Sequence, residues 1–184
     1  MKKLLALMFC LTLLFSLVGC GTRATDNKPS NTAVNESNDN NVSNNNIGSI
    51  QEDICELYLE VLEDLWNVDS GLNNEISQIG IDLSELSNLT EAEKEYVMSS
   101  FASKHDLPYI IGTFEELCDQ GLIDKENLIW EDGLFFSIKT NEDKKTFDAQ
   151  KWRSGLGAYF FGQCIAQRDT NGKWSYTIGQ EMIA

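Results

Sequence analysis

The stretch that decides the fold covers residues 133–178 and reads GLFFSIKTNEDKKTFDAQKWRSGLGAYFFGQCIAQRDTNGKWSYTI. Runs rich in Phe, Ile, Tyr and Trp alternate there with short polar segments, a pattern typical of β-strands joined by turns. Asn171-Gly172 lies between the last two runs and favours the type I′ turn of a tight hairpin. The stretch therefore predicts an antiparallel β-meander of about four strands, which we place at residues 133–139, 145–152, 157–168 and 173–183.

The segment before the meander contains three patterns that mark helix starts. Ser49, Thr90 and Thr113 are each followed three residues later by a Glu. This spacing is the capping box, in which the hydroxyl and the carboxylate satisfy free backbone N–H groups. Behind Ser49, apolar residues recur at helical spacing and predict an amphipathic helix at about 50–67. Thr90 and Thr113 predict a helix at about 91–104 and a third, short helix.

The two later helices have recognisable inward faces. The second is expected to present Ala92, Tyr96, Ser99 and Ser100 at helical spacing, with Val97 and Phe101 beside them. The third is expected to turn Phe114, Leu117 and Cys118 inward and to end at Gly121. Residues 72–89 are ambiguous, with a helix possible from Leu72 to Ile79, and a short strand at Pro108–Ile111 would add an edge or a parallel pairing.

Helices first and strands last indicate an α+β fold, with the N-terminal helices packed on one face of the C-terminal sheet. This arrangement resembles the architecture of cystatin-like or NTF2-like domains. Residues 50–184 have the length of a single domain.

The first twenty residues have the pattern of a bacterial secretory signal. Met1-Lys2-Lys3 is basic, Leu4 to Val18 is apolar and uncharged, and this run is too short to span a bilayer comfortably. Leu17-Val18-Gly19-Cys20 resembles the lipobox of bacterial lipoproteins. The resemblance implies that residues 1–19 are removed, that Cys20 carries a diacylglyceryl group, and that membrane lipid is a partner. The protein would then be anchored to the extracytoplasmic face of the cell membrane. The alternative is an ordinary secretory signal that contains a Cys.

Residues 20–49 are expected to form a disordered tether. Positions 21–49 contain nine Asn, four Ser and three Thr, and almost nothing apolar. Such a segment buries too little surface to offset the entropy lost on ordering. A flexible chain of this length would reach about 30 Å from the membrane.

The charge of the folded part limits its partners. Residues 50–184 hold 10 Lys and Arg against 26 Asp and Glu, which gives a net charge of −16. Nucleic acid and anionic membrane surfaces require the opposite sign. A basic partner is compatible with this charge, although acidity more often serves solubility.

Cysteine and histidine offer little chemistry. Cys55, Cys118 and Cys164 have no metal-ligand spacing and lie among apolar neighbours, so they are expected in the core, although one pair could be bridged. His105 is the single His, and no Gly-x-Ser-x-Gly motif accompanies it. We therefore expect neither zinc nor any other cofactor, and we assign His105 to capping or to the surface.

The most unusual stretch is 151–161, which combines Lys, Arg, aromatic residues and glycines. As a binding site, it would use Trp152 for stacking and Arg153 to hold a carboxylate or phosphate, with Trp130 as a third contact. Alternatively it is a bulged strand connection in which Arg153 pairs with one of the many acids. The structural interpretation is the stronger of the two.

Two classes of function agree with these patterns. The first is a non-enzymatic, membrane-tethered module that binds an envelope protein or a small ligand. The second is a small hydrolase or transferase that uses carboxylates such as Glu131 or Asp132. Catalysis of that kind needs two carboxyl groups facing each other across a cleft. Neighbouring residues on a strand point to opposite faces, so Glu131 and Asp132 would not form such a pair by themselves.

Overall fold

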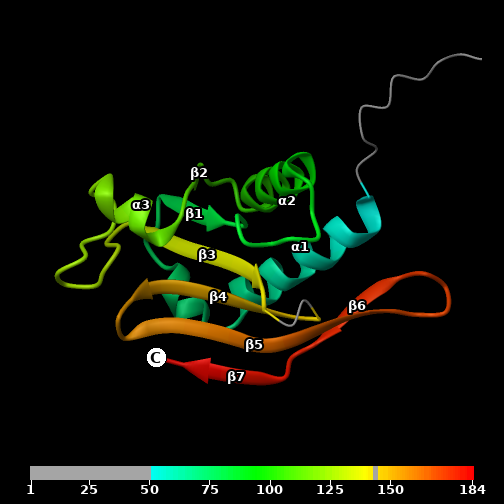
Figure 1. Ribbon diagram of the computed structural model, residues 1–184. Helices are drawn as coiled ribbons and strands as arrows, with labels where there is room; N and C mark the ends of the chain where they lie inside the picture. The colour runs from blue at the N-terminus through cyan, green and yellow to red at the C-terminus, as the bar shows by residue number, and fades with distance from the viewer. Residues whose placement is uncertain (1–50, 143–144) are drawn as a thin grey trace, which may run out of the picture. The chain divides into compact units, whose positions relative to one another are not determined.

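The computed structural model describes residues 51–142 and 145–184, and it confirms an α+β fold. Within these residues, three α-helices and a short 3-10 helix, η1, pack around one mixed sheet of seven strands. The arrangement of the helices and the sheet can be followed in Figure 1. No helix among them is long and apolar enough to cross a membrane. The elements in chain order are α1 Glu52–Asn67, η1 Ser70–Asn73, β1 Gln78–Asp82, α2 Glu91–Lys104, β2 Tyr109–Ile111, α3 Phe114–Asp119, β3 Gly133–Thr140, β4 Thr146–Ser154, β5 Gly157–Arg168, β6 Trp174–Thr177 and β7 Gln180–Ile183.

The sheet is larger than the predicted meander. Its strand order is β2-β1-β3-β4-β5-β6, and β7 pairs with β5 beside β6. From β3 to β6 the strands form the expected antiparallel meander, but β1 lies parallel to both β2 and β3. The predicted short strand at 108–111 is confirmed as β2, which pairs in parallel with β1 at the sheet edge.

The structure settles one open question about the strands and corrects one expectation. The possible helix from Leu72 to Ile79 is instead η1 followed by β1, where Ile79 and Ile81 alternate with Gly80 and are fully buried. The predicted strand 173–183 is two strands, because the chain bends at Gly179. A Cβ at Gly179 would lie 2.7 Å from the carbonyl oxygen of Gln163, so only glycine fits this close approach.

The last hairpin forms where it was expected, but through a different turn. A type I′ turn requires positive φ at both central residues. Gly172 has a φ of +86°, whereas Asn171 is not among the residues with positive φ. Asp169 Oδ1 instead accepts hydrogen bonds from the backbone N–H groups of Asn171 (2.8 Å) and Lys173 (2.9 Å). The side chain of Asp169 therefore organises the turn.

Two capping boxes are confirmed. Thr90 Oγ1 accepts from Glu93 N at 3.3 Å, while Glu93 Oε2 accepts from Thr90 N at 2.8 Å. Thr113 and Glu116 repeat the arrangement at the start of α3. In α1 the N-cap position is Gln51, and the Ser49 of the predicted box lies outside the described residues.

The inward face of α2 differs from the prediction. Val97, Met98, Phe101 and Ala102 are buried, whereas Ala92 is exposed and the other predicted members, Tyr96, Ser99 and Ser100, are only partly buried. Val97, Met98 and Phe101 bury more apolar surface than the row of Ala92, Ser99 and Ser100 would bury. These larger side chains therefore decide which side of α2 faces the core.

The two faces of the sheet are covered unequally. On the covered face, α1 and α2 pack against apolar side chains from β1, β3, β4 and β5, which form the main core. On the opposite face, α3 and the loop after it cover a smaller core of Leu117, Ile123, Trp130 and Phe135. This second cover does not extend over the middle of β3, β4, β5 and β7. We call this uncovered part of the sheet the open face. It includes Ser137, Lys139, Asp148, Gln150, Phe160, Gly162, Gln180 and Met182.

Candidate functional site

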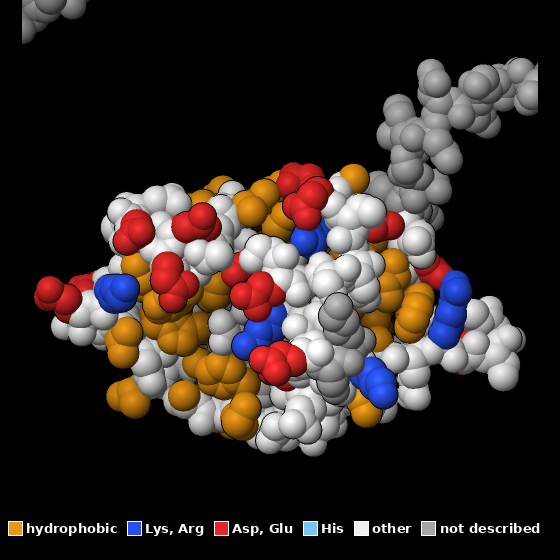
Figure 2. Space-filling model, viewed as in Figure 1, with side chains coloured by type: hydrophobic (Ala, Val, Ile, Leu, Met, Phe, Trp, Pro, Cys, Tyr) orange, Lys and Arg blue, Asp and Glu red, His pale blue; other side chains and the backbone are white. Residues whose placement is uncertain are grey.

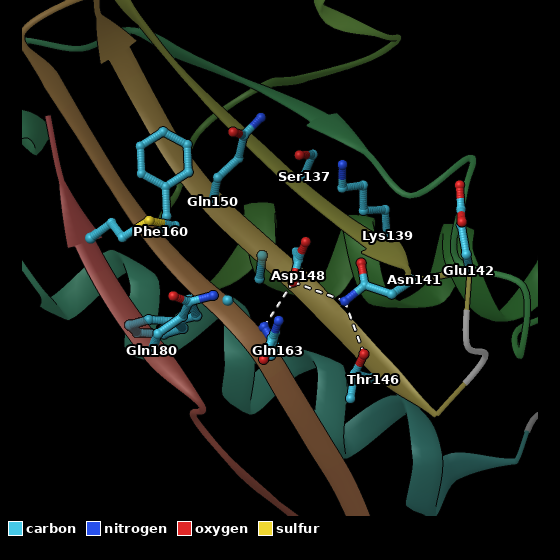
Figure 3. Close-up of a pocket in the computed structure, with 14 residues that line it drawn as sticks. Ser137, Lys139, Asn141, Glu142, Thr146, Asp148, Gln150, Phe160, Gln163 and Gln180 are labelled. Atoms are coloured by element: carbon cyan, nitrogen blue, oxygen red, sulfur yellow. Dashed lines mark hydrogen bonds between the residues drawn. The ribbon is translucent and has the colours of Figure 1, made fainter.

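The open face contains a depression of about 670 Å³, which is lined by residues of β3, β4, β5 and β7. Figure 3 looks onto the sheet from this side, with α1 behind it, and shows Gln150, Phe160 and Asp148 rising from β4 and β5. Figure 2 shows hydrophobic side chains gathered below α3 and a mixture of charged and uncharged polar side chains over the middle of the sheet.

The floor of the depression is a glycine on a central strand. Gly162 is paired with Gln180 of β7, and a Cβ at Gly162 would lie 2.9 Å from Gln180 Cγ. Next to it, Gln163 adopts a φ of +51° at an irregularity in the β4–β5 pairing. Gly162 therefore leaves room for the side chain of Gln180, whose atoms lie where a Cβ at this position would make contact.

Asp148 holds this bulge in position. Its Oδ1 accepts hydrogen bonds from the backbone N–H of Gln163 at 2.8 Å and from Asn141 Nδ2 at 3.0 Å. Asn141 Nδ2 also donates to Thr146 Oγ1 at 3.0 Å, as the dashed lines in Figure 3 show. The carboxylate therefore uses one oxygen for the fold, and its Oδ2 takes no hydrogen bond from a described residue.

The rest of the depression combines polar and apolar contact groups. Phe160 and Met182 are cross-strand partners, and Met182 is 48% exposed. Gln150 and Gln180 offer amides that both donate and accept, and neither amide is bonded to a described residue. An apolar surface with a few convergent polar groups is the usual composition of a recognition site.

The described residues offer no obvious catalytic or metal centre. No group of three His, Cys, Asp or Glu side chains in residues 51–142 and 145–184 is placed to hold a metal ion. Glu131 and Asp132 are exposed and do not line the depression. Asp132 Oδ2 accepts from Ser77 Oγ at 2.9 Å at the entrance to β3.

Of the three residues proposed from sequence for ligand contact, Trp130 and Trp152 lie on the α3 side of the sheet. Trp130 is fully buried, its ring packs directly over Gly133, and its Nε1 has no hydrogen-bond partner among the described residues. Trp152 is partly buried and meets Phe114 edge-on, with ring centroids 4.8 Å apart. Both belong to the smaller core, so the structure brings them together but not onto the open face.

Arg153 connects three segments through backbone carbonyls. Its Nη1 donates to the oxygens of Leu72 (2.9 Å) and Asn74 (2.5 Å), and its Nη2 donates to that of Glu131 (2.7 Å). The pairing between β4 and β5 is irregular at this point, as the structural interpretation predicted. The expectation that Arg153 pairs with an acid was wrong, because its guanidinium donates to three backbone carbonyls instead.

Lys151 has the most unusual environment and was not singled out for it. It is fully buried, and its Nζ donates to the carbonyls of Trp66 (3.3 Å), Val68 and Asp69 (3.2 Å) and to Asn73 Oδ1 (3.2 Å). Burial lowers its pKa to about 8, while the negative charge of Asp69 acts in the opposite direction. The ammonium therefore binds the carbonyls at the end of α1, where the helix dipole favours a cation.

His105 and the cysteines have structural environments. His105 occupies the C-cap position of α2, stacks on Trp66 at 3.8 Å between centroids, and places Nε2 3.0 Å from Glu63 Oε1. Cys118 and Cys164 are free thiols; Cys55 and Cys164 are buried and Cys118 is partly buried. Burial raises the pKa of Cys164 to about 11, so this thiol is a poor nucleophile.

The residues of the open face could have been found from the sequence by strand alternation. In β4, Phe147, Ala149 and Lys151 face the helices, so Asp148 and Gln150 must face away. What the pattern could not show is that α3 stops short of them. No family model, no curated protein and no solved structure matches the chain.

Proposed function

We propose that this protein is an exported lipoprotein, anchored through lipid on Cys20, whose folded part binds a ligand at the open face without catalysing a reaction. The lipobox-like residues 17–20 and the Asn- and Ser-rich residues 21–49 support the anchor and the tether. The proposal of a ligand site is supported by the open face.

One observation carries the binding proposal. The face opposite α1 and α2 is sealed by α3 over Trp130 and Phe135, yet it is left open over the depression at Gly162. Phe160 and Met182 remain accessible there beside unbonded amides of Gln150 and Gln180. A partly apolar surface with unsatisfied donors and acceptors gains contacts when a partner covers it.

Site-specific photo-crosslinking in intact cells tests this assignment. A photoreactive side chain at position 150 should capture a reproducible product, because this position lies inside the open face. The same group at Glu60, exposed on α1, is the matched control and should capture none. Equal capture at both positions, or no capture at either, would remove the open face as the binding site.

The anchor has a separate test. Metabolic labelling with a fatty acid should mark the wild-type chain and leave Cys20→Ser unlabelled, because the thiol is the attachment point that the lipobox implies. Equal label in the two chains would refute the anchor and leave the binding proposal unaffected.

A further inference from the structure

We propose that the ligand of the open face is an extended peptide segment that carries Lys or Arg side chains. This inference rests on the binding function proposed above and adds the chemical class of the partner.

The depression is one part of a longer groove. A second depression of about 250 Å³ lies between α3 and the sheet, and Ser137, Lys139 and Gln150 line both. Together they extend from Asp82 on β1 across β3, β4 and β5 to Gln180 on β7. Four strand spacings correspond to about 19 Å, the length of about six residues of extended chain. The groove therefore fits a linear segment better than a single compact molecule.

The groove is strongly acidic. Its lining includes the carboxylates of Asp82, Glu85, Glu115, Glu142 and Asp148, against the single ammonium of Lys139. Glu85, Glu115 and Glu142 are exposed, and none of them forms an ion pair within residues 51–142 and 145–184. Such a surface attracts a cationic segment and repels nucleic acid and anionic lipid. A second copy of this chain is disfavoured as well, because residues 50–184 carry a net charge of −16.

The uncharged groups of the groove suit a peptide backbone. The amides of Gln150 and Gln180 can each donate to a carbonyl and accept from an N–H. Phe160 and Met182 together form an apolar patch that one aliphatic side chain can cover. Lys139 lies between the acids of the β1 side and those of the β4 side, so the ligand should be uncharged where it crosses this residue.

Fluorescence anisotropy with the full chain in non-ionic detergent tests the charge requirement. The probe is a labelled peptide of four Lys-Leu-Gly repeats, and the control probe replaces each Lys with Glu. We expect the Lys peptide to bind with an affinity that falls as salt is added, and the Glu peptide not to bind. Binding of both peptides, or of neither, overturns the inference.

Two charge-matched variants locate the site. The first variant removes three charges from the groove through Glu85→Gln, Glu115→Gln and Glu142→Gln. It should weaken binding of the Lys peptide about tenfold. Glu56→Gln, Glu60→Gln and Glu126→Gln remove the same number of charges from exposed positions outside the groove and should change it less than about twofold. Equal weakening by the two triple variants would mean that only the net charge matters, and would overturn the groove as the peptide site.

Failure of the peptide inference can be distinguished from failure of the proposed binding function. If crosslinking from position 150 succeeds in cells while the Lys peptide fails to bind, the open face is a site for a different ligand class. If both fail, the binding function itself is refuted.

Discussion

The covered and open faces of the same sheet differ in what their side chains do. On the covered face, side chains such as Phe136, Phe147 and Phe161 are almost completely buried against α1 and α2. Lys151, a fully buried cation on this face, binds four oxygens. On the open face, Gln150 and Gln180 have no bonded partner among the described residues. The covered face therefore contributes most of the packing that stabilises the fold, and the open face carries the proposed ligand site.

Strand β4 shows the contrast within a few residues. Phe147, Ala149 and Lys151 belong to the covered face, while Asp148 and Gln150 alternate with them on the open face. Because alternate side chains of a strand point to opposite faces, a single strand serves both purposes. Substitutions on the two faces should consequently separate into those that lower stability and those that lower ligand capture.

The largest loss of stability is expected for Lys151→Met. The substitution leaves the carbonyls at the end of α1 and the amide of Asn73 without their shared donor, at a cost of about 4 kcal/mol in the free energy of unfolding. Urea denaturation measures this value. A loss below about 1 kcal/mol would show that the carbonyls find water or other donors instead.

The contribution of Lys151 should also depend on pH. Burial lowers its pKa from the ordinary 10.5 to about 8, so between these values the unfolded chain holds a proton that the folded chain has lost. The stabilising contribution of Lys151 is then greatest above about pH 10.5 and is lost as the pH falls through about 8. The difference in unfolding free energy between wild type and Lys151→Met should widen between about pH 7.5 and pH 9.5. A constant difference would mean that the surrounding carbonyls cancel the effect of burial.

A somewhat smaller loss is expected for Gly133→Ala. The new Cβ would lie 1.9 Å from Cε2 of the buried Trp130, so the ring must move out of the smaller core. We expect a cost of about 3 kcal/mol. Gly71→Ala is the control, because a Cβ at Gly71 would lie 3.7 Å from its nearest neighbour, Asp69 Oδ1. Thermal unfolding should shift for the first variant and hardly at all for the second.

Arg153→Ala should have an intermediate effect. The guanidinium links the carbonyls of Leu72, Asn74 and Glu131, and its loss should cost about 2 kcal/mol. Because these bonds lie outside the depression, ligand capture per folded molecule should remain. A normal unfolding free energy combined with lost capture would restore Arg153 as a ligand contact.

The smallest effect on stability is expected for Gln150→Ala on the open face. Its amide makes no hydrogen bond to a described residue, so the free energy of unfolding should change by less than about 0.5 kcal/mol. Capture by a photoreactive group at position 180 should nevertheless decrease. Unchanged capture would show that the amide of Gln150 is not a ligand contact.

Much of the fold could be predicted from local sequence patterns. The capping boxes at Thr90 and Thr113 and the alternation after Gly133 depend on neighbouring residues, and both predictions are confirmed. Strand β1 was missed because it is five residues long, contains Gly80 and is defined by pairing with strands far along the chain. Its Ile-Gly-Ile pattern has meaning only once Trp130 is known to pack over the glycine.

The candidate site was harder to predict, because it too depends on contacts between residues far apart in the chain. The concentration of charge and aromatic residues at 151–161 drew attention to Trp152 and Arg153, whose partners lie in loops that sequence patterns do not position. The open face is assembled from ordinary residues such as Gln150 and Gln180. They become notable only because α3 does not cover them.

The central claim, that the open face is occupied in the cell, can be tested through the side chain of Met182. This residue is 48% exposed on the open face, whereas Ile183 beside it on β7 is 71% exposed and does not line the depression. Hydroxyl-radical oxidation should be compared between intact cells and the purified full chain, with peptide-level mass spectrometry as the readout. We predict that Met182 is oxidised more slowly in cells while Ile183 and the 92% exposed Leu156 are not protected. Equal oxidation of Met182 in the two samples would contradict the assignment of the open face as a binding site.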